Sequence, residues 1–81
     1  IAYHHSGRFA PAIQSFSQAL ALAPDDADVH NNLGSALQGD GRLSEAVAGF
    51  QRALQIDPRH SNAASNLAQA FQELGEDSRA R

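Results

Sequence analysis

The sequence predicts an all-α fold, an α-solenoid of antiparallel helix pairs in which each pair packs against the next. Two observations predict it. The 81-residue chain repeats itself with a period of 34 residues, and within each period the apolar residues recur at helical spacing. When the sequence is shifted by 34 residues, 15 of the 47 aligned pairs are identical, among them Phe16 with Phe50 and Pro24 with Pro58.

Each period contains two apolar stripes, and therefore two helices. Steps of three and four residues place one stripe on residues 43–56, and the same stripe recurs one period earlier. The expected helices span residues 1–5, 9–22, 26–38, 43–56 and 60–74, with a further helix starting near the C-terminus. Pro11 should fall in a first turn, where its missing N–H does no harm. Glycines should stop the second helices at Gly41 and at Gly75.

The turn after Pro24 carries three acidic residues, Asp25, Asp26 and Asp28. Carboxylates at this position suit the free N–H groups and the positive dipole of a helix N-terminus, so we expect them to cap the helix that follows. Their spacing also resembles the start of a calcium loop, but the glycine and the distal glutamate that such a loop requires are missing.

Small residues at fixed places predict close helix packing. Gly34 and Ala68 should let the two helices of one unit approach, and Ala46 and Ala53 should do so for the neighbouring unit. The chain divides into a partial repeat over 1–26, a complete repeat over 27–60 and a partial repeat over 61–81. Four apolar residues have no obvious covering partner: Ile1, Tyr3, Phe71 and Leu74. They indicate a longer array or ends covered by other copies.

The middle unit resembles the tetratricopeptide repeat family in its period and in its motif. The matching residues are Leu33, Gly34, Leu37, Gly41, Ala46, Phe50, Ala53 and Pro58. His30 stands where the family often has tryptophan. The resemblance implies a right-handed superhelix that binds a protein or an extended peptide on its concave face, without catalysis.

In that family the first helix of each unit lines the concave face. The polar residues that lie off the packing stripe of these helices are Asp28, Asn31, Asn32, Ser35, Gln38, Asn62, Ser65, Asn66, Gln69, Gln72 and Glu73, with His4 and His5 in the comparable place of the first unit. An asparagine amide both donates and accepts, so it can pair with the N–H and C=O groups of a peptide.

Asn32 and Asn66 recur one unit apart. This pattern is similar to the asparagine ladder inside O-linked N-acetylglucosamine transferase superhelices; the alternative is that both are ordinary surface residues. A carboxylate clamp, the mode of chaperone-binding members, needs lysine and arginine as well as asparagine. Only Asn32 matches it, because Ile1, Asn62 and Asn66 occupy the other clamp positions and the chain has no lysine.

Several function classes find no support in the sequence. The net charge is −3 and the six arginines are scattered, so no basic stripe for nucleic acid is present. No run of about 18 apolar residues predicts a membrane span. The chain has no cysteine, and His4, His5, His30 and His60 lack metal-ligand spacing. No nucleophile and base are paired, and no cofactor motif occurs.

The sequence therefore favours a binding scaffold over two alternatives. One is a non-catalytic segment of a larger enzyme, such as a bacterial glycosyltransferase. The other is a scaffold that assembles with copies of itself through its open repeat ends.

Overall fold

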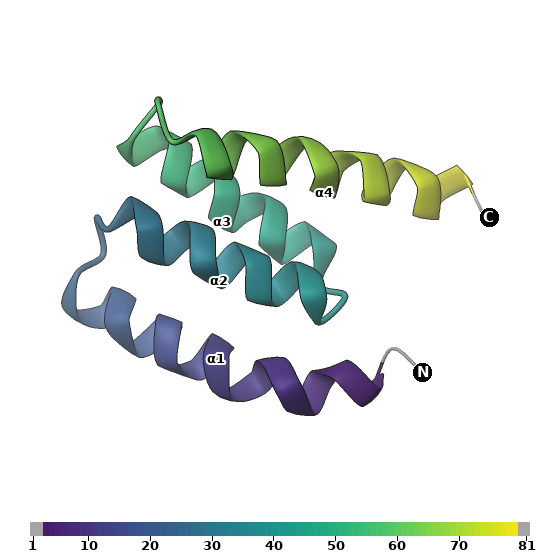
Figure 1. Cartoon of the computed structure of the whole chain (residues 1–81), viewed down its shortest axis with the longest axis horizontal. Coiled ribbons are helices and arrows are strands. Elements are labelled where there is room, and N and C mark those ends of the chain that lie inside the picture. Colours follow the sequence, from purple (N-terminus) through teal and green to yellow (C-terminus); the bar gives the residue numbers. More distant parts are fainter. Residues whose placement is uncertain (1–2, 80–81) are drawn as a thin grey trace.

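The structure is a computed structural model that describes residues 3–79, with the side chains of residues 9–75. It consists of four helices, listed in chain order as α1 (Tyr3–Leu22), α2 (Ala27–Gly39), α3 (Leu43–Ile56) and α4 (Ser61–Arg79). Short turns join them, successive helices run in opposite directions (Figure 1), and the described part contains no strand. The predicted all-α solenoid is thus confirmed.

The turn between α2 and α3 requires a glycine. Gly41 adopts a φ of 85°, in the left-handed region that side chains disfavour. There the Arg42 N–H donates to the Leu37 carbonyl at 2.8 Å and the Gly41 N–H donates to the Gln38 carbonyl at 3.1 Å. These two bonds satisfy the last carbonyls of α2 in a Schellman motif, so the chain reverses sharply into α3.

The turn between α1 and α2 uses a carboxylate cap. Asp26 has extended backbone angles, and its side chain accepts a hydrogen bond from the Val29 N–H at 3.2 Å. This bond satisfies one of the free donors of the first turn of α2. The prediction that an aspartate caps this helix is confirmed for Asp26.

Two predicted helix boundaries are wrong. α1 runs without a break through Gly7, so Pro11 lies inside the helix and not in its first turn. α4 likewise continues through Gly75 to Arg79. Glycine permits a left-handed turn but does not impose one. Gly41 turns because α3 folds back onto α2, whereas no helix folds back after Gly75 in the described residues.

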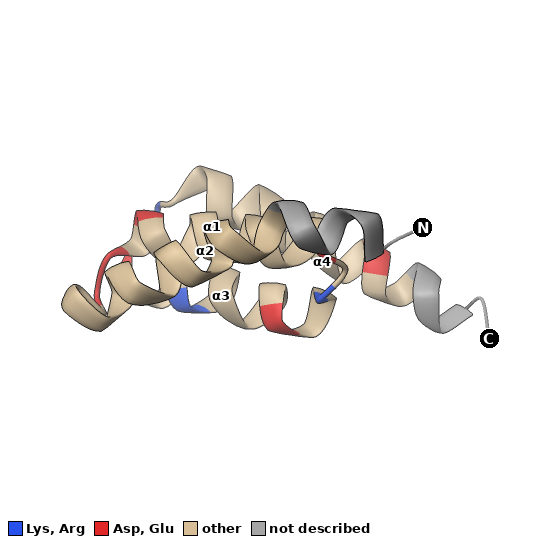
Figure 2. Ribbon diagram, turned by 90° about the horizontal axis from the view of Figure 1, so that it is seen from below, with Lys and Arg blue, Asp and Glu red and all other residues tan. Residues whose placement is uncertain are grey.

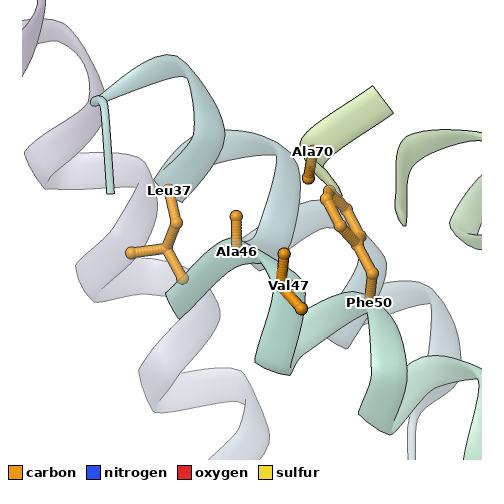
Figure 3. Close-up of a cluster of buried hydrophobic side chains, with 5 residues drawn as sticks. All are labelled: Leu37, Ala46, Val47, Phe50 and Ala70. Atoms are coloured by element: carbon orange, nitrogen blue, oxygen red, sulfur yellow. The ribbon is translucent and has the colours of Figure 1, made fainter. Parts of the chain in front are cut away.

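The core lies between α2, α3 and α4. Phe50 of α3 is fully buried (0% exposed), and its ring lies beside Ala70 of α4 (Figure 3). The same ring packs on Gly34 of α2, where an added Cβ atom would lie only 2.6 Å from the Cε1 atom of Phe50. Ala46 and Ala53 are fully buried as well. The expectation that small residues allow close packing is therefore confirmed at these three positions.

The helices do not pack symmetrically. α2 packs against α1, α3 and α4, whereas α1 and α3 make no close backbone contact with each other. The first helices of the two units, α2 and α4, therefore meet while the second helices diverge, which puts α2 and α4 on the inner side of the curve. The molecule forms a flat layer of 38 × 27 × 14 Å.

The apolar residues at the end of the array differ in burial. Phe71 is 50% exposed, as expected. Leu74, expected to be uncovered, instead packs partly against the core cluster. Ala68 is exposed, so it does not bring two helices together as predicted. Ile1 lies outside the described residues, and so does the side chain of Tyr3.

Candidate functional site: the inner face of α2 and α4

A row of polar side chains joins α2 to α4 along the inner side. At one end His60 contacts Asp28, with 2.7 Å between Nε2 and Oδ1. At the other end the Gln38 amide donates to the Glu73 carboxylate at 2.9 Å. We call this row the inner seam. Its contacts link residues 31 to 35 positions apart, so they connect one repeat with the next.

Asn66 forms the middle of the inner seam. Its Nδ2 atom lies 3.0 Å from the Asn31 Oδ1 atom and 3.5 Å from the Ser35 hydroxyl. Asn31 is only 8% exposed, and it is a buried polar residue of the core region. Because a buried amide needs a partner, the Asn66 bond stabilises the contact between α2 and α4.

His60 caps α4 and links it to α2 with the same ring. The Ala63 N–H donates to the Nδ1 atom of His60 at 3.1 Å, so Nδ1 carries no proton. The remaining ring proton is therefore on Nε2, and Nε2–H donates to the Asp28 carboxylate. The His60 side chain is 10% exposed, which holds the ring in this orientation.

The sequence analysis missed this role of His60. The signal was present, because a shift of 34 residues aligns His60 with Asp26, the cap of α2. Histidine is an uncommon cap, and its reach to Asp28 depends on how close α2 and α4 lie. His30, the residue in the usual tryptophan position, is half-buried and bonds the Pro24 carbonyl through Nε2 at 2.8 Å.

A second polar row on α4 has no such contacts. Asn62, Ser65, Gln69 and Gln72 are all exposed, and their spacing puts them on one stripe of the helix. We call them the free amide stripe. The corresponding residues of α2, one repeat earlier, are Asp28, Asn31, Ser35 and Gln38, and these form the inner seam. The same stripe is thus engaged on α2 and accessible on α4.

The predicted binding residues therefore fall into two groups. Those of the inner seam are Asp28, Asn31, Ser35, Gln38, Asn66 and Glu73. Those with exposed side chains outside it are Asn32, Asn62, Ser65, Gln69 and Gln72. Asn31 was predicted to belong to the accessible surface, and its burial under the α2–α4 contact corrects this. The side chains of His4 and His5 lie outside the described residues.

The two asparagines of the suggested ladder have different surroundings. Asn32 is exposed on α2, whereas Asn66 is half-buried and already bonded to Asn31. Asn32 therefore offers both its donor and its acceptor groups to a ligand. Asn66 offers fewer, since its Nδ2 atom serves the inner seam.

The charged side chains described on α2 and α4 are acidic only. They are Asp28 and Glu73, and neither helix has an arginine within residues 9–75. Further acidic residues gather at the turn between α1 and α2, seen in red at one end of Figure 2. There Asp25 lies 3.5 Å from the Nη2 atom of Arg52, a contact from α3 that is weak because both groups are exposed.

No metal or cofactor site emerges from this geometry. Within the described residues no three histidine, aspartate or glutamate side chains lie close enough together to hold a metal ion. Asp25, Asp26 and Asp28 have separate partners, namely Arg52, the Val29 N–H and His60. Nor does any helix of the described part combine the length and the apolar character that crossing a bilayer requires.

Comparison with known families decides what kind of repeat this is. The family profile described as TPR repeat matches residues 2–41, and the one described as Tetratricopeptide repeat matches residues 27–60. This chain carries tetratricopeptide repeats. No curated protein matches the sequence. Tetratricopeptide repeats in general form scaffolds for protein interaction, and the four-helix structure has the helix pairs of such a scaffold.

Proposed function

We propose that the chain binds a segment of a partner protein along the inner face of α2 and α4. The observation that carries this proposal is the free amide stripe together with Asn32, an accessible set of amide and hydroxyl groups on the inner helices. Amides donate and accept at once, so they suit the main chain of an extended segment as well as polar side chains of a helix. The chain acts by binding and has no catalytic step of its own.

The absence of basic side chains from these two helices defines the kind of segment. Asp28 and Glu73 are the described charges on them, and the Asp28 side chain is largely exposed. A segment that carries lysine or arginine near Asp28 gains attraction, whereas an acidic segment is repelled. The site is therefore proposed for a neutral or basic segment that is held mainly through its amide groups.

Substitution on the two polar rows tests the proposal. Binders are selected from a random-peptide display library, and their affinity is measured for the unmodified chain and for Asn32→Ala and Gln69→Ala. Each truncation removes one amide that no other residue of the chain uses, so we expect roughly a 3- to 10-fold loss of affinity per hydrogen bond. Asn66→Ala is a poorer probe, because it also breaks the inner seam.

Gln14→Ala serves as the matched control. Gln14 is an exposed amide on α1, away from the inner face, so its truncation should leave the affinity unchanged. Binders whose affinity ignores Asn32 and Gln69 but follows Gln14 would contradict the proposed site. A circular dichroism spectrum of each variant shows whether its helices are intact.

A further inference from the structure

The outward face of α4 is the largest uncovered apolar surface of the described chain. It includes Phe71, which is 50% exposed, and Ala64 and Ala68, which are exposed. One repeat earlier the corresponding residues of α2 are covered by α3. Leu37, the counterpart of Phe71, is only 6% exposed.

The contact between α2 and α3 shows which kind of helix covers such a face. Phe50 inserts its ring over Gly34, and Ala46 and Ala53 are buried beside it. α1 is the 34-residue counterpart of α3: the residues Ala12, Phe16, Ala19 and Leu20 are identical to Ala46, Phe50, Ala53 and Leu54. α1 therefore carries the same apolar stripe that covers α2.

This stripe of α1 is itself incompletely covered. Ala12, Phe16 and Ala19 are half-buried, whereas their three counterparts on α3 are fully buried. The described side chains of α1, residues 9–22, also include no charged residue, while α3 carries Glu45 and Arg52 on its solvent side. A helix without charges is typical of one that is covered on more than one side.

We propose that a second copy of this chain docks the stripe of its α1 on the outward face of α4. The contact repeats the α2–α3 contact between two molecules, with Phe16 of the second copy over Ala68 of the first. Because the two surfaces differ, the contact is head-to-tail. It leaves one α1 and one α4 uncovered at the ends, so further copies add in a row.

Two substitutions make this contact looser than its intramolecular counterpart. Ala68 replaces Gly34, and a Cβ atom at Gly34 would lie 2.6 Å from the Phe50 ring. Ser15 replaces Gly49, where an added Cβ atom would lie 3.3 Å from the His30 carbonyl oxygen. The helices of two copies therefore sit farther apart than α2 and α3. We expect reversible association that grows with concentration.

Sedimentation equilibrium of the 81-residue chain over a range of concentrations tests the proposal. The expected result is a weight-average mass that rises continuously with concentration. A mass that stays at the monomer value up to the highest soluble concentration would overturn it.

Two blocking variants identify the surfaces. Ala68→Arg places a charged side chain on the outward face of α4, and Ser15→Arg places one on the stripe of α1. Both residues are exposed, so neither change should unfold the chain. Each variant alone should lose association, since every head-to-tail contact needs both surfaces. Gln18→Arg is the control, because Gln18 is exposed and corresponds to the solvent-exposed Arg52 of α3.

A mixture of the two blocked variants makes the test decisive. Ser15→Arg keeps its α4 face and Ala68→Arg keeps its α1 stripe, so equal amounts should form a dimer that cannot grow. If Ser15→Arg alone still dimerises, two α4 faces pair with each other and the head-to-tail contact is wrong. If the mixture stays monomeric although the unmodified chain associates, the pairing of α1 with α4 is equally refuted.

Discussion

α2 and α4 occupy the same place in successive repeats, yet they differ in what surrounds them. α2 is covered by α3 on one side and by α4 on another, whereas α4 has only α3 and the edge of α2 beside it. Leu37 on α2 is therefore 6% exposed and its counterpart Phe71 is 50% exposed. The larger side chain is the more exposed one, so burial follows the neighbours and not the apolar character of the residue.

The polar side of the two helices shows the same difference. Asn31 of α2 is buried and bonded to Asn66, while its counterpart Ser65 on α4 is exposed. A stripe that joins two repeats on α2 is thus accessible on α4. The comparison teaches that a repeated sequence position acquires its role from the unit packed against it.

The largest expected effect is at the two aromatic rings. Phe50→Ala removes a fully buried ring from the core, and by the usual cost of such a cavity it should destabilise the chain by about 3–5 kcal/mol. For so small a domain this loss is a large part of the total stability. Phe71→Ala should cost about 1 kcal/mol or less, since half of that side chain already contacts water. Urea unfolding followed by circular dichroism measures both. Equal losses would break the contrast between α2 and α4.

The aligned glycines Gly41 and Gly75 should respond in opposite directions. Neither has an atom within 4 Å of an added Cβ, so space does not distinguish them. Gly41→Ala forces alanine into a left-handed conformation and should cost about 1–2 kcal/mol. Gly75→Ala replaces a glycine inside α4 and should stabilise the helix by about 0.5–1 kcal/mol. Thermal unfolding of the two variants gives the signs, and a loss at Gly75 would mean that α4 ends there.

The caps of the two inner helices allow a finer comparison. His60→Ala removes the acceptor for the Ala63 N–H and should cost about 1 kcal/mol, as does the loss of other caps. His60→Ser keeps a capping oxygen while removing the contact with Asp28, so it should cost less than the alanine change. Urea unfolding ranks the two variants. Nitrogen-15 shifts of the imidazole should show the proton on Nε2; a proton on Nδ1 would contradict the cap.

Much of this fold was predictable because a repeat makes its own pattern visible. The stripe that contains Ala46, Phe50 and Ala53 predicted both α3 and its buried face. Gly41 predicted the turn that follows α2. Gly75 did not predict a helix end, since the same residue type turns only where the next helix returns to the core.

The site was predictable in part. The polar residues of α2 and α4 identified the inner face, but not which of them pair across it. Asn66 reaches Asn31 and Ser35, and His60 reaches Asp28, only because the two helices lie at a particular distance and angle. Side-chain pairing of this kind depends on coordinates of residues about one repeat apart, and no local pattern records it.

The sequence alone determined the repeat period, the helix pairs and the identity of the apolar stripes, because these follow from residue spacing within one helix. Only the tertiary structure decided which copies of each stripe are covered and which are accessible. The physical reason is that burial and hydrogen bonding are properties of contacts between helices. Identical side chains therefore become core, seam or binding surface according to what lies against them.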